Sequence, residues 1–112
     1  MKTIFEKILD KEINTNFLYE DEFCAAFNDI APVAPIHCLI IPKIKIINLK
    51  ESVSEYVETM GHLMAAVPEV AKIVCPNNDF RLVINNGETA GQTVFYLHIH
   101  LLSGRKFNWP PG

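Results

Sequence analysis

The stretch TVFYLHIHLL, residues 93–102, indicates the fold class because it is an apolar run rich in aromatic and β-branched residues. Such a run predicts a strand, and side chains alternate between the two faces of a strand. One face is entirely apolar and is expected to meet the core, through Phe95, Leu97, Ile99 and Leu101. The opposite face is expected to present three groups that exchange hydrogen bonds or protons: Tyr96, His98 and His100.

Two helices are predicted from caps and from apolar spacing. Thr3 is an expected N-cap and Glu6 stands three residues later, which forms a capping box and predicts a short helix over residues 4–11. Apolar residues separated alternately by four and three positions predict a long helix over residues 53–74. The members of this stripe are Val53, Val57, Met60, Met64, Val67, Ala71 and Val74.

The other strands are predicted from short apolar runs bounded by turn residues. Residues 16–21 and 23–29 are typical of a hairpin, residues 36–42 of a buried strand, and residues 80–87 of a further strand. With the strand described first, this order predicts an α+β domain of five mostly antiparallel strands. Both helices are expected on one face of the sheet. The pattern contains no linker, so one domain over residues 1–112 is predicted.

Composition argues against several classes of protein. The chain has 112 residues and a formal charge of -3, which disfavours a clamp for nucleic acid. No apolar run approaches the ~20 residues of a membrane span, and the charged N-terminus is unlike a signal peptide. Three cysteines without a CxxC pair are expected to be buried, reduced thiols. A cytoplasmic protein is therefore expected, with the nucleus as a second compartment in a eukaryote.

The residues by themselves leave the role of the two histidines open. His98 and His100 either bracket a small anionic group or are hydrogen-bonded side chains without a chemical role. Zinc is a third alternative, with His37 as a further ligand, but a zinc site needs three or four ligands. No carboxylate–histidine spacing supports it, so neither a metal nor a cofactor is predicted.

The longer stretch GQTVFYLHIHLLSGR, residues 91–105, resembles the signature of the histidine triad (HIT) family, His-φ-His-φ-His-φ-φ with φ apolar. Tyr96 replaces the first histidine of that signature. The blocks TIFEKILDKEI, AFNDIAPVAPIHCLIIPK, GHLM, VINNG and WPPG are similar to the Hint branch, the nucleoside phosphoramidases. The resemblance covers nearly the whole chain. It implies a HIT-like fold whose sheet continues across a homodimer, with the tail at Trp109 reaching the partner's active site.

The resemblance also assigns roles to individual residues. It implies that His98 is the nucleophile, that His100 and His37 hold the phosphate, and that Thr93 assists catalysis. Asp29 matches the residue that binds the ribose hydroxyls, and Asn28 stands where relatives often have histidine. The implied phosphate site also contains Asn85, Gly91 and Gln92, and Val94 is a further implied nucleotide-binding residue. The implied base pocket consists of Phe5, Ile8, Ile13, Phe27, Ile30 and Leu39.

The activity that follows from the resemblance is hydrolysis of a purine nucleoside 5′-phosphoramidate, through a nucleotidyl-His98 intermediate. Nucleotides of the AMP and GMP type are the expected ligands. Two alternatives remain: a nucleotide-binding interaction module with weak or no turnover, and a dinucleoside polyphosphate hydrolase. For hydrolysis of a phosphoramidate, the attacking nitrogen of His98 must be unprotonated. The other ring nitrogen should therefore donate to a fixed acceptor such as a backbone carbonyl. Tyr96 is expected to support its neighbours without taking part in the chemistry.

Overall fold

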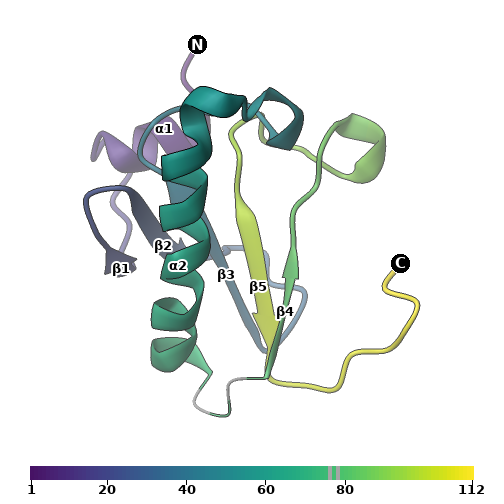
Figure 1. Ribbon diagram of the computed structural model, residues 1–112. Coiled ribbons are helices and arrows are strands. Elements are labelled where there is room, and N and C mark those ends of the chain that lie inside the picture. The colour runs from purple at the N-terminus through teal and green to yellow at the C-terminus, as the bar shows by residue number, and fades with distance from the viewer. Residues whose placement is uncertain (76, 78) are drawn as a thin grey trace.

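The protein folds around one five-stranded sheet (Figure 1). The computed structural model describes residues 1–75, 77 and 79–112. The strands lie in the order β1-β2-β3-β5-β4, and every neighbouring pair is antiparallel. Their bounds are β1 Phe17–Glu20, β2 Cys24–Asn28, β3 Ile36–Pro42, β4 Phe80–Val83 and β5 Ile99–Ser103. The predicted α+β class with five antiparallel strands is confirmed.

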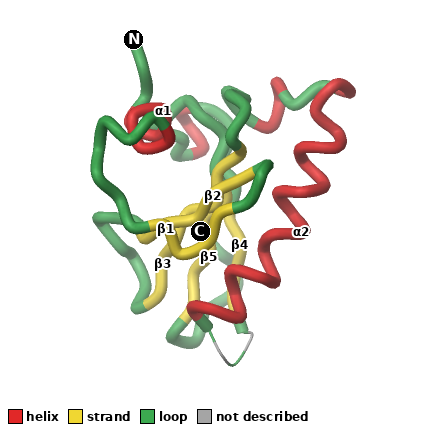
Figure 2. Tube along the Cα trace, turned by 90° about the vertical axis from the view of Figure 1, so that its left-hand side faces the viewer, coloured by secondary structure: helices red, strands yellow, loops and turns green. Residues whose placement is uncertain are grey.

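The central strand β3 is buried on both faces, because its sequence IHCLIIP is apolar at successive positions. Cys38 and Ile40 pack with the long helix α2, Val57–Val74, whereas Leu39 and Ile41 pack with the short helix α1, Ile4–Leu9. Figure 2 shows the two helices on either side of the sheet. The prediction that both helices cover one face is therefore wrong.

Helix α1 begins at the predicted capping box. The Thr3 hydroxyl accepts from the Glu6 amide at 3.2 Å, and the Glu6 carboxylate accepts from the Thr3 amide at 2.9 Å. A cap of this kind contributes about 1 kcal/mol. The helix ends at Leu9, earlier than predicted, and Lys11 has a positive φ of 65° that ends the helical path. Phe5 and Ile8 are its buried residues.

Helix α2 begins at Val57 because residues 54–56 form a 3-10 turn. Its buried side chains are Leu63, Ala66, Val67, Val70 and Ala71. The predicted stripe is wrong at Val57, which is 68% exposed, and also at Val53 and Met64. The apolar arc of this helix is wider than the stripe, and the sheet contacts the part of the arc that contains the smaller Ala and Val side chains.

Strand β5 starts later than predicted, so that residues 93–98 precede the paired strand. Ile99 pairs with Ile40, and upstream of that pair the chain is held by other bonds. The Leu97 amide donates to the Ile46 carbonyl at 2.6 Å, and the Tyr96 hydroxyl donates to the Pro42 carbonyl at 2.5 Å. This path leaves Phe95 45% exposed, which corrects its predicted place in the core, whereas the buried positions of Leu97, Ile99 and Leu101 are confirmed.

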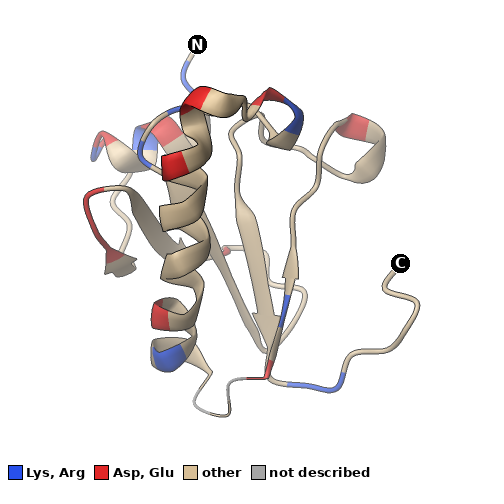
Figure 3. Ribbon diagram, in the orientation of Figure 1, with Lys and Arg blue, Asp and Glu red and all other residues tan. Residues whose placement is uncertain are grey.

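Charged residues lie mainly on the helices and connecting loops, with both signs interspersed (Figure 3). Neither β3 nor β5 contains Lys, Arg, Asp or Glu. Any charge beside the histidines of these two strands must therefore come from neighbouring segments. Among the described residues, no helix has both the length and the apolarity needed to cross a bilayer.

Candidate active site

A cavity of about 350 Å³ opens between α1, the end of β2 and the segment before β5. Its floor and walls are mostly apolar, which suits a flat ring that binds by burial. Polar groups gather at one side, where His98 and His100 line the cavity beside Thr93. Its apolar lining consists of Ile4, Phe5, Ile8, Ile13, Phe27, Ile30, Leu39 and Val94.

His98 is held by the backbone two residues before it. It is 7% exposed, and its Nδ1 lies 2.7 Å from the Tyr96 carbonyl oxygen. A carbonyl oxygen only accepts, so Nδ1 carries the proton and Nε2 keeps a lone pair. Burial lowers the pKa of His98, although this hydrogen bond and the charge of Asp29 oppose the shift. The ring is therefore neutral at pH 7 and presents an unprotonated nitrogen.

His100 meets His37 across the β3–β5 pair. Nε2 of His37 lies 2.9 Å from Nδ1 of His100, and Nδ1 of His37 accepts from the Val33 amide at 3.1 Å. Burial lowers the pKa of His100 to about 4, with further lowering by the neighbouring His98 and His37. His100 is therefore a neutral hydrogen-bonding group at pH 7.

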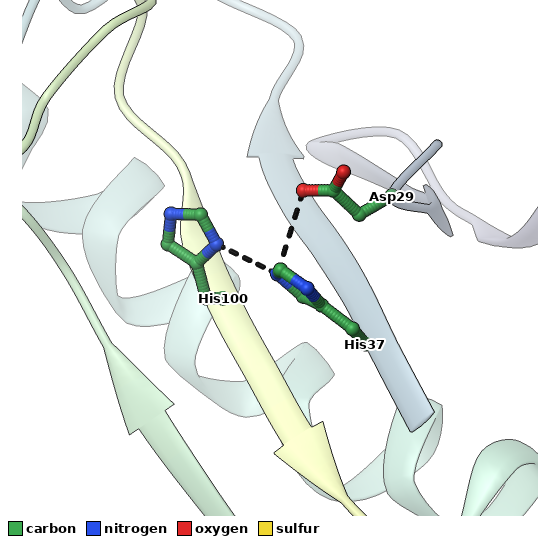
Figure 4. Close-up of side chains that lie close together, drawn as sticks. All are labelled: Asp29, His37 and His100. Atoms are coloured by element: carbon green, nitrogen blue, oxygen red, sulfur yellow. Dashed lines mark hydrogen bonds and ion pairs between the residues drawn. The ribbon is translucent and has the colours of Figure 1, made fainter. Parts of the chain in front are cut away.

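Asp29 joins this cluster from the turn after β2 (Figure 4). One carboxylate oxygen accepts from the Ala31 amide at 2.8 Å, as in an Asx turn. The other oxygen lies 3.4 Å from Nε2 of His37. The carboxylate is partly exposed and lines the cavity, so it supplies negative charge at the edge of the site.

The chain matches the family model of the HIT domain over residues 10–107. It belongs to the HIT domain family. This HIT domain is 49% identical to an uncharacterized HIT-like protein of Synechococcus elongatus, over 98% of this chain and 96% of the relative. It is 46% identical to a 14 kDa zinc-binding protein of Zea mays, over 98% of this chain and 88% of the relative.

A solved HIT family hydrolase from Legionella pneumophila Philadelphia 1 has the same fold as this HIT domain, with a TM-score of 0.90. The two are 35% identical, and the superposition covers 99% of this chain and 100% of the other. The domain therefore shares its architecture with HIT-family hydrolases. The likeness extends over the whole sheet and both helices, which places the cavity within the matched region.

The HIT domain brings most of the predicted site residues together around this cavity. All six predicted base-pocket residues line it, as do Asn28, Asp29, Thr93, Val94, His98 and His100. His37 lies directly behind His100. Three further residues that the sequence did not single out also line the cavity, Ile4, Asn14 and Thr15. Ile4 lies one helical turn before Ile8, which is a usable signal, whereas the loop residues Asn14 and Thr15 follow no periodic pattern.

Besides His37, three residues of the predicted phosphate site are not in the cavity lining, namely Asn85, Gly91 and Gln92. Their contact with a phosphate stays a prediction. The Gln92 amide group donates to the carbonyls of Ile47 and Val94, and its oxygen accepts from Gly87. Its hydrogen-bonding groups thus hold the loop together. Gly91 has a φ of 103°, and Asn85 lies against it, 3.5 Å from the position that a Cβ would take.

Tyr96 is buried on the α1 side of the sheet, at 1% exposure. Its ring contacts Phe5 edge-on, with ring centroids 6.0 Å apart. Trp109 is 82% exposed and lies in the extended tail, beside the outer edge of β4. His62 of α2 stacks on Phe23 with ring centroids 3.6 Å apart.

Proposed function

We propose that this HIT domain hydrolyses purine nucleoside 5′-phosphoramidates and is of the Hint type. The observation that carries the proposal is the 2.7 Å hydrogen bond from Nδ1 of His98 to the Tyr96 carbonyl, which leaves Nε2 free beside an apolar cavity. A neutral, oriented imidazole of this kind is a competent nucleophile toward phosphorus.

The proposed reaction has two displacements. In the first, Nε2 of His98 bonds to the α-phosphorus and the P–N bond of the substrate breaks. The leaving nitrogen keeps the electron pair and takes up a proton. In the second, a water oxygen bonds to phosphorus and loses a proton, the bond to His98 breaks, and a nucleoside monophosphate leaves. Each displacement replaces one phosphorus substituent, which divides a difficult hydrolysis into two steps.

The rest of the cavity accounts for the proposed substrate class. The apolar lining provided by Phe5, Phe27 and Leu39 suits a purine base, which is bound by burial and edge contacts. Asp29 offers carboxylate oxygens to a ribose diol at the polar side of the cavity. The base and ribose would then place the α-phosphate beside His98 and His100.

The test is turnover of adenosine 5′-phosphoramidate with and without His98. Wild-type protein should release AMP, and rapid acid quenching should trap a nucleotidyl adduct on His98 by mass spectrometry. The His98→Ala variant should bind AMP and form no adduct. Binding of AMP by wild-type protein without release of product would contradict the proposed hydrolysis and leave a nucleotide-binding module.

The proposed assembly is a homodimer, and its support is the outer edge of β4. This strand pairs with β5 on one side, so its other edge offers backbone groups to a second copy. The exposed Trp109 lies near that edge. Sedimentation velocity should give a dimer mass, and a monomer at micromolar concentration would contradict this assembly.

A further inference from the structure

A cluster of three side chains is formed by Asp29, His37 and His100. Ligand binding by each residue separately does not explain why the three contact one another. Their nearest oxygen and nitrogen atoms all lie within 4.8 Å of one another, which is compatible with a metal site (Figure 4). Two histidines and a carboxylate are also a usual set of zinc ligands. The hydrogen bonds around His37 decide between a metal site and another role.

The Val33 amide is the deciding group, because a backbone N–H can only donate. It donates to Nδ1 of His37 at 3.1 Å, which uses the lone pair of that nitrogen. The proton of a neutral His37 must then be on Nε2, the atom that faces the cluster. A metal ligand needs a lone pair at Nε2 and usually a donor N–H at Nδ1. The ring thus has the wrong tautomer for a metal, and turning it over would replace both bonded nitrogens by carbons.

We propose that the Val33 amide and His37 together lock His100 in the tautomer that carries its proton on Nε2. His37 donates its Nε2 proton to Nδ1 of His100 at 2.9 Å, so Nδ1 of His100 is an acceptor. The remaining ring proton of His100 is on Nε2, which points away from His37 (Figure 4). Since His100 lines the cavity, the lock keeps a permanent N–H donor on its wall.

Asp29 favours the same arrangement. Its carboxylate oxygen lies 3.4 Å from Nε2 of His37, where a negative charge attracts the proton on that nitrogen. The loop that brings Val33 to His37 is closed by its own backbone, because the Asp29 amide donates to the His37 carbonyl at 3.0 Å. Val33 and Asp29 therefore act on the two nitrogens of one ring, and both select the same tautomer.

The lock makes His98 and His100 chemically different although both are neutral histidines. His98 presents a lone pair at Nε2, because its Nδ1 proton goes to the Tyr96 carbonyl. His100 presents a proton at Nε2. The importance of this contrast for catalysis rests on the function proposed above: His98 attacks phosphorus while His100 donates to a phosphoryl oxygen. His37 acts through its contact with Nδ1 of His100 and is a positioning residue in this proposal.

The tautomers are measured directly by long-range ¹H–¹⁵N correlation spectra of the ¹⁵N-histidine-labelled, ligand-free protein at pH 7. His37 and His100 should show protonated Nε2 and unprotonated Nδ1, whereas His98 should show the reverse. A proton on Nδ1 of His100 in the wild-type protein would overturn the lock. This spectrum needs no variant and no substrate, so it is informative whatever the enzymatic activity.

Two variants of nearly equal shape test the direction of the bond from residue 37. In His37→Gln the amide still donates to Nδ1 of His100, so the wild-type tautomer should persist. In His37→Glu a carboxylate can only accept, so a proton should move to Nδ1 of His100. Backbone amide spectra of the two variants report whether each is folded, and an unchanged His100 tautomer in a folded Glu variant would contradict the proposal.

Zinc and turnover provide two further measurements. Equimolar zinc chloride should leave the His37 nitrogens unchanged, whereas protonation of its Nδ1 on adding zinc would show coordination through Nε2 and overturn the lock. On adenosine 5′-phosphoramidate, His37→Glu should turn over ~10²–10³-fold more slowly than His37→Gln, the usual effect of losing one such donor. If the wild type has no turnover, the proposed function fails and the tautomer spectra still stand.

Discussion

Removing the hydroxyl of Tyr96 should destabilise the protein and leave the chemistry almost intact. In Tyr96→Phe the Pro42 carbonyl loses the Tyr96 hydroxyl, which donates to it at 2.5 Å. This hydrogen bond is buried, since Tyr96 is 1% exposed. A buried acceptor left without a partner costs ~1–3 kcal/mol. At ~4–8 °C per kcal/mol for a domain near this size, the melting temperature should fall by roughly 5–20 °C. His98 is oriented by the main-chain oxygen of residue 96, which the substitution retains.

The assay for Tyr96→Phe combines urea denaturation with kinetics on adenosine 5′-phosphoramidate at a temperature where the variant is folded. The value of kcat should remain within a few-fold of wild type. Tyr19→Phe is a matched control, because the Tyr19 hydroxyl donates to Asp21 at 2.7 Å in a partly exposed place away from the cavity. That variant should lose ~1 kcal/mol or less. Loss of turnover in Tyr96→Phe as complete as in His98→Ala would refute the reasoning.

Three further predictions concern charge and burial. The pKa of His100 is about 4 in the folded protein and ~6.5 in the unfolded chain. Between these two pH values the unfolded state binds more protons than the folded state. The free energy of unfolding should therefore fall as the pH drops from 6.5 to 4. Urea denaturation at pH 7 and pH 5 should show a smaller loss in His100→Gln, and equal losses would contradict this assignment. Asp29→Asn keeps the oxygen that accepts from the Ala31 amide, and it should weaken AMP binding ~10-fold or more, with little effect on the binding of 2′-deoxy-AMP. Calorimetry with both ligands checks this. If the binding of the two ligands is weakened equally, Asp29 does not contact the ribose hydroxyls. Burial raises the pKa of Cys24 to about 12 and of Cys38 to about 11, so an aromatic disulfide reagent should modify these thiols only after unfolding, and fast reaction of either in native protein would contradict their burial.

The strands were predictable because period-two alternation and short apolar runs are local properties of the sequence. The run IHCLIIP also indicates that β3 is buried on both faces. Cys38 and Leu39 are adjacent, so they point to opposite faces, and both are apolar. The placement of the helices was not predictable in the same way. A helix with an apolar arc as wide as that of α2 can contact the sheet through Met64 or through Leu63, and only the shape of the opposing sheet selects between them.

The candidate site was partly predictable for a related reason. His98, His100 and the apolar residues of the cavity belong to motifs or periodic patterns, so their common location could be inferred. The orientation of Gln92 could not, because its amide group is used by carbonyls of Ile47 and Val94, and no sequence pattern shows which loops will meet. Asn14 and Thr15 reach the cavity for the same nonlocal reason, by the path of the loop after α1.

Tyr96 stands where the histidine triad signature, by resemblance, has its first histidine, and its contacts indicate which groups the proposed chemistry needs. His98 needs an acceptor for its Nδ1 proton. The backbone carbonyl of residue 96 supplies this acceptor at 2.7 Å, and it would do so with any side chain at position 96. The Tyr96 side chain points instead into the packing beneath α1, where it bonds to Pro42. The donor at the other end of the histidine cluster is likewise a backbone group, the Val33 amide. Because two main-chain groups set the proposed tautomers, packing constrains the side chain of residue 96, and this side chain can change without removing the proposed nucleophile, His98.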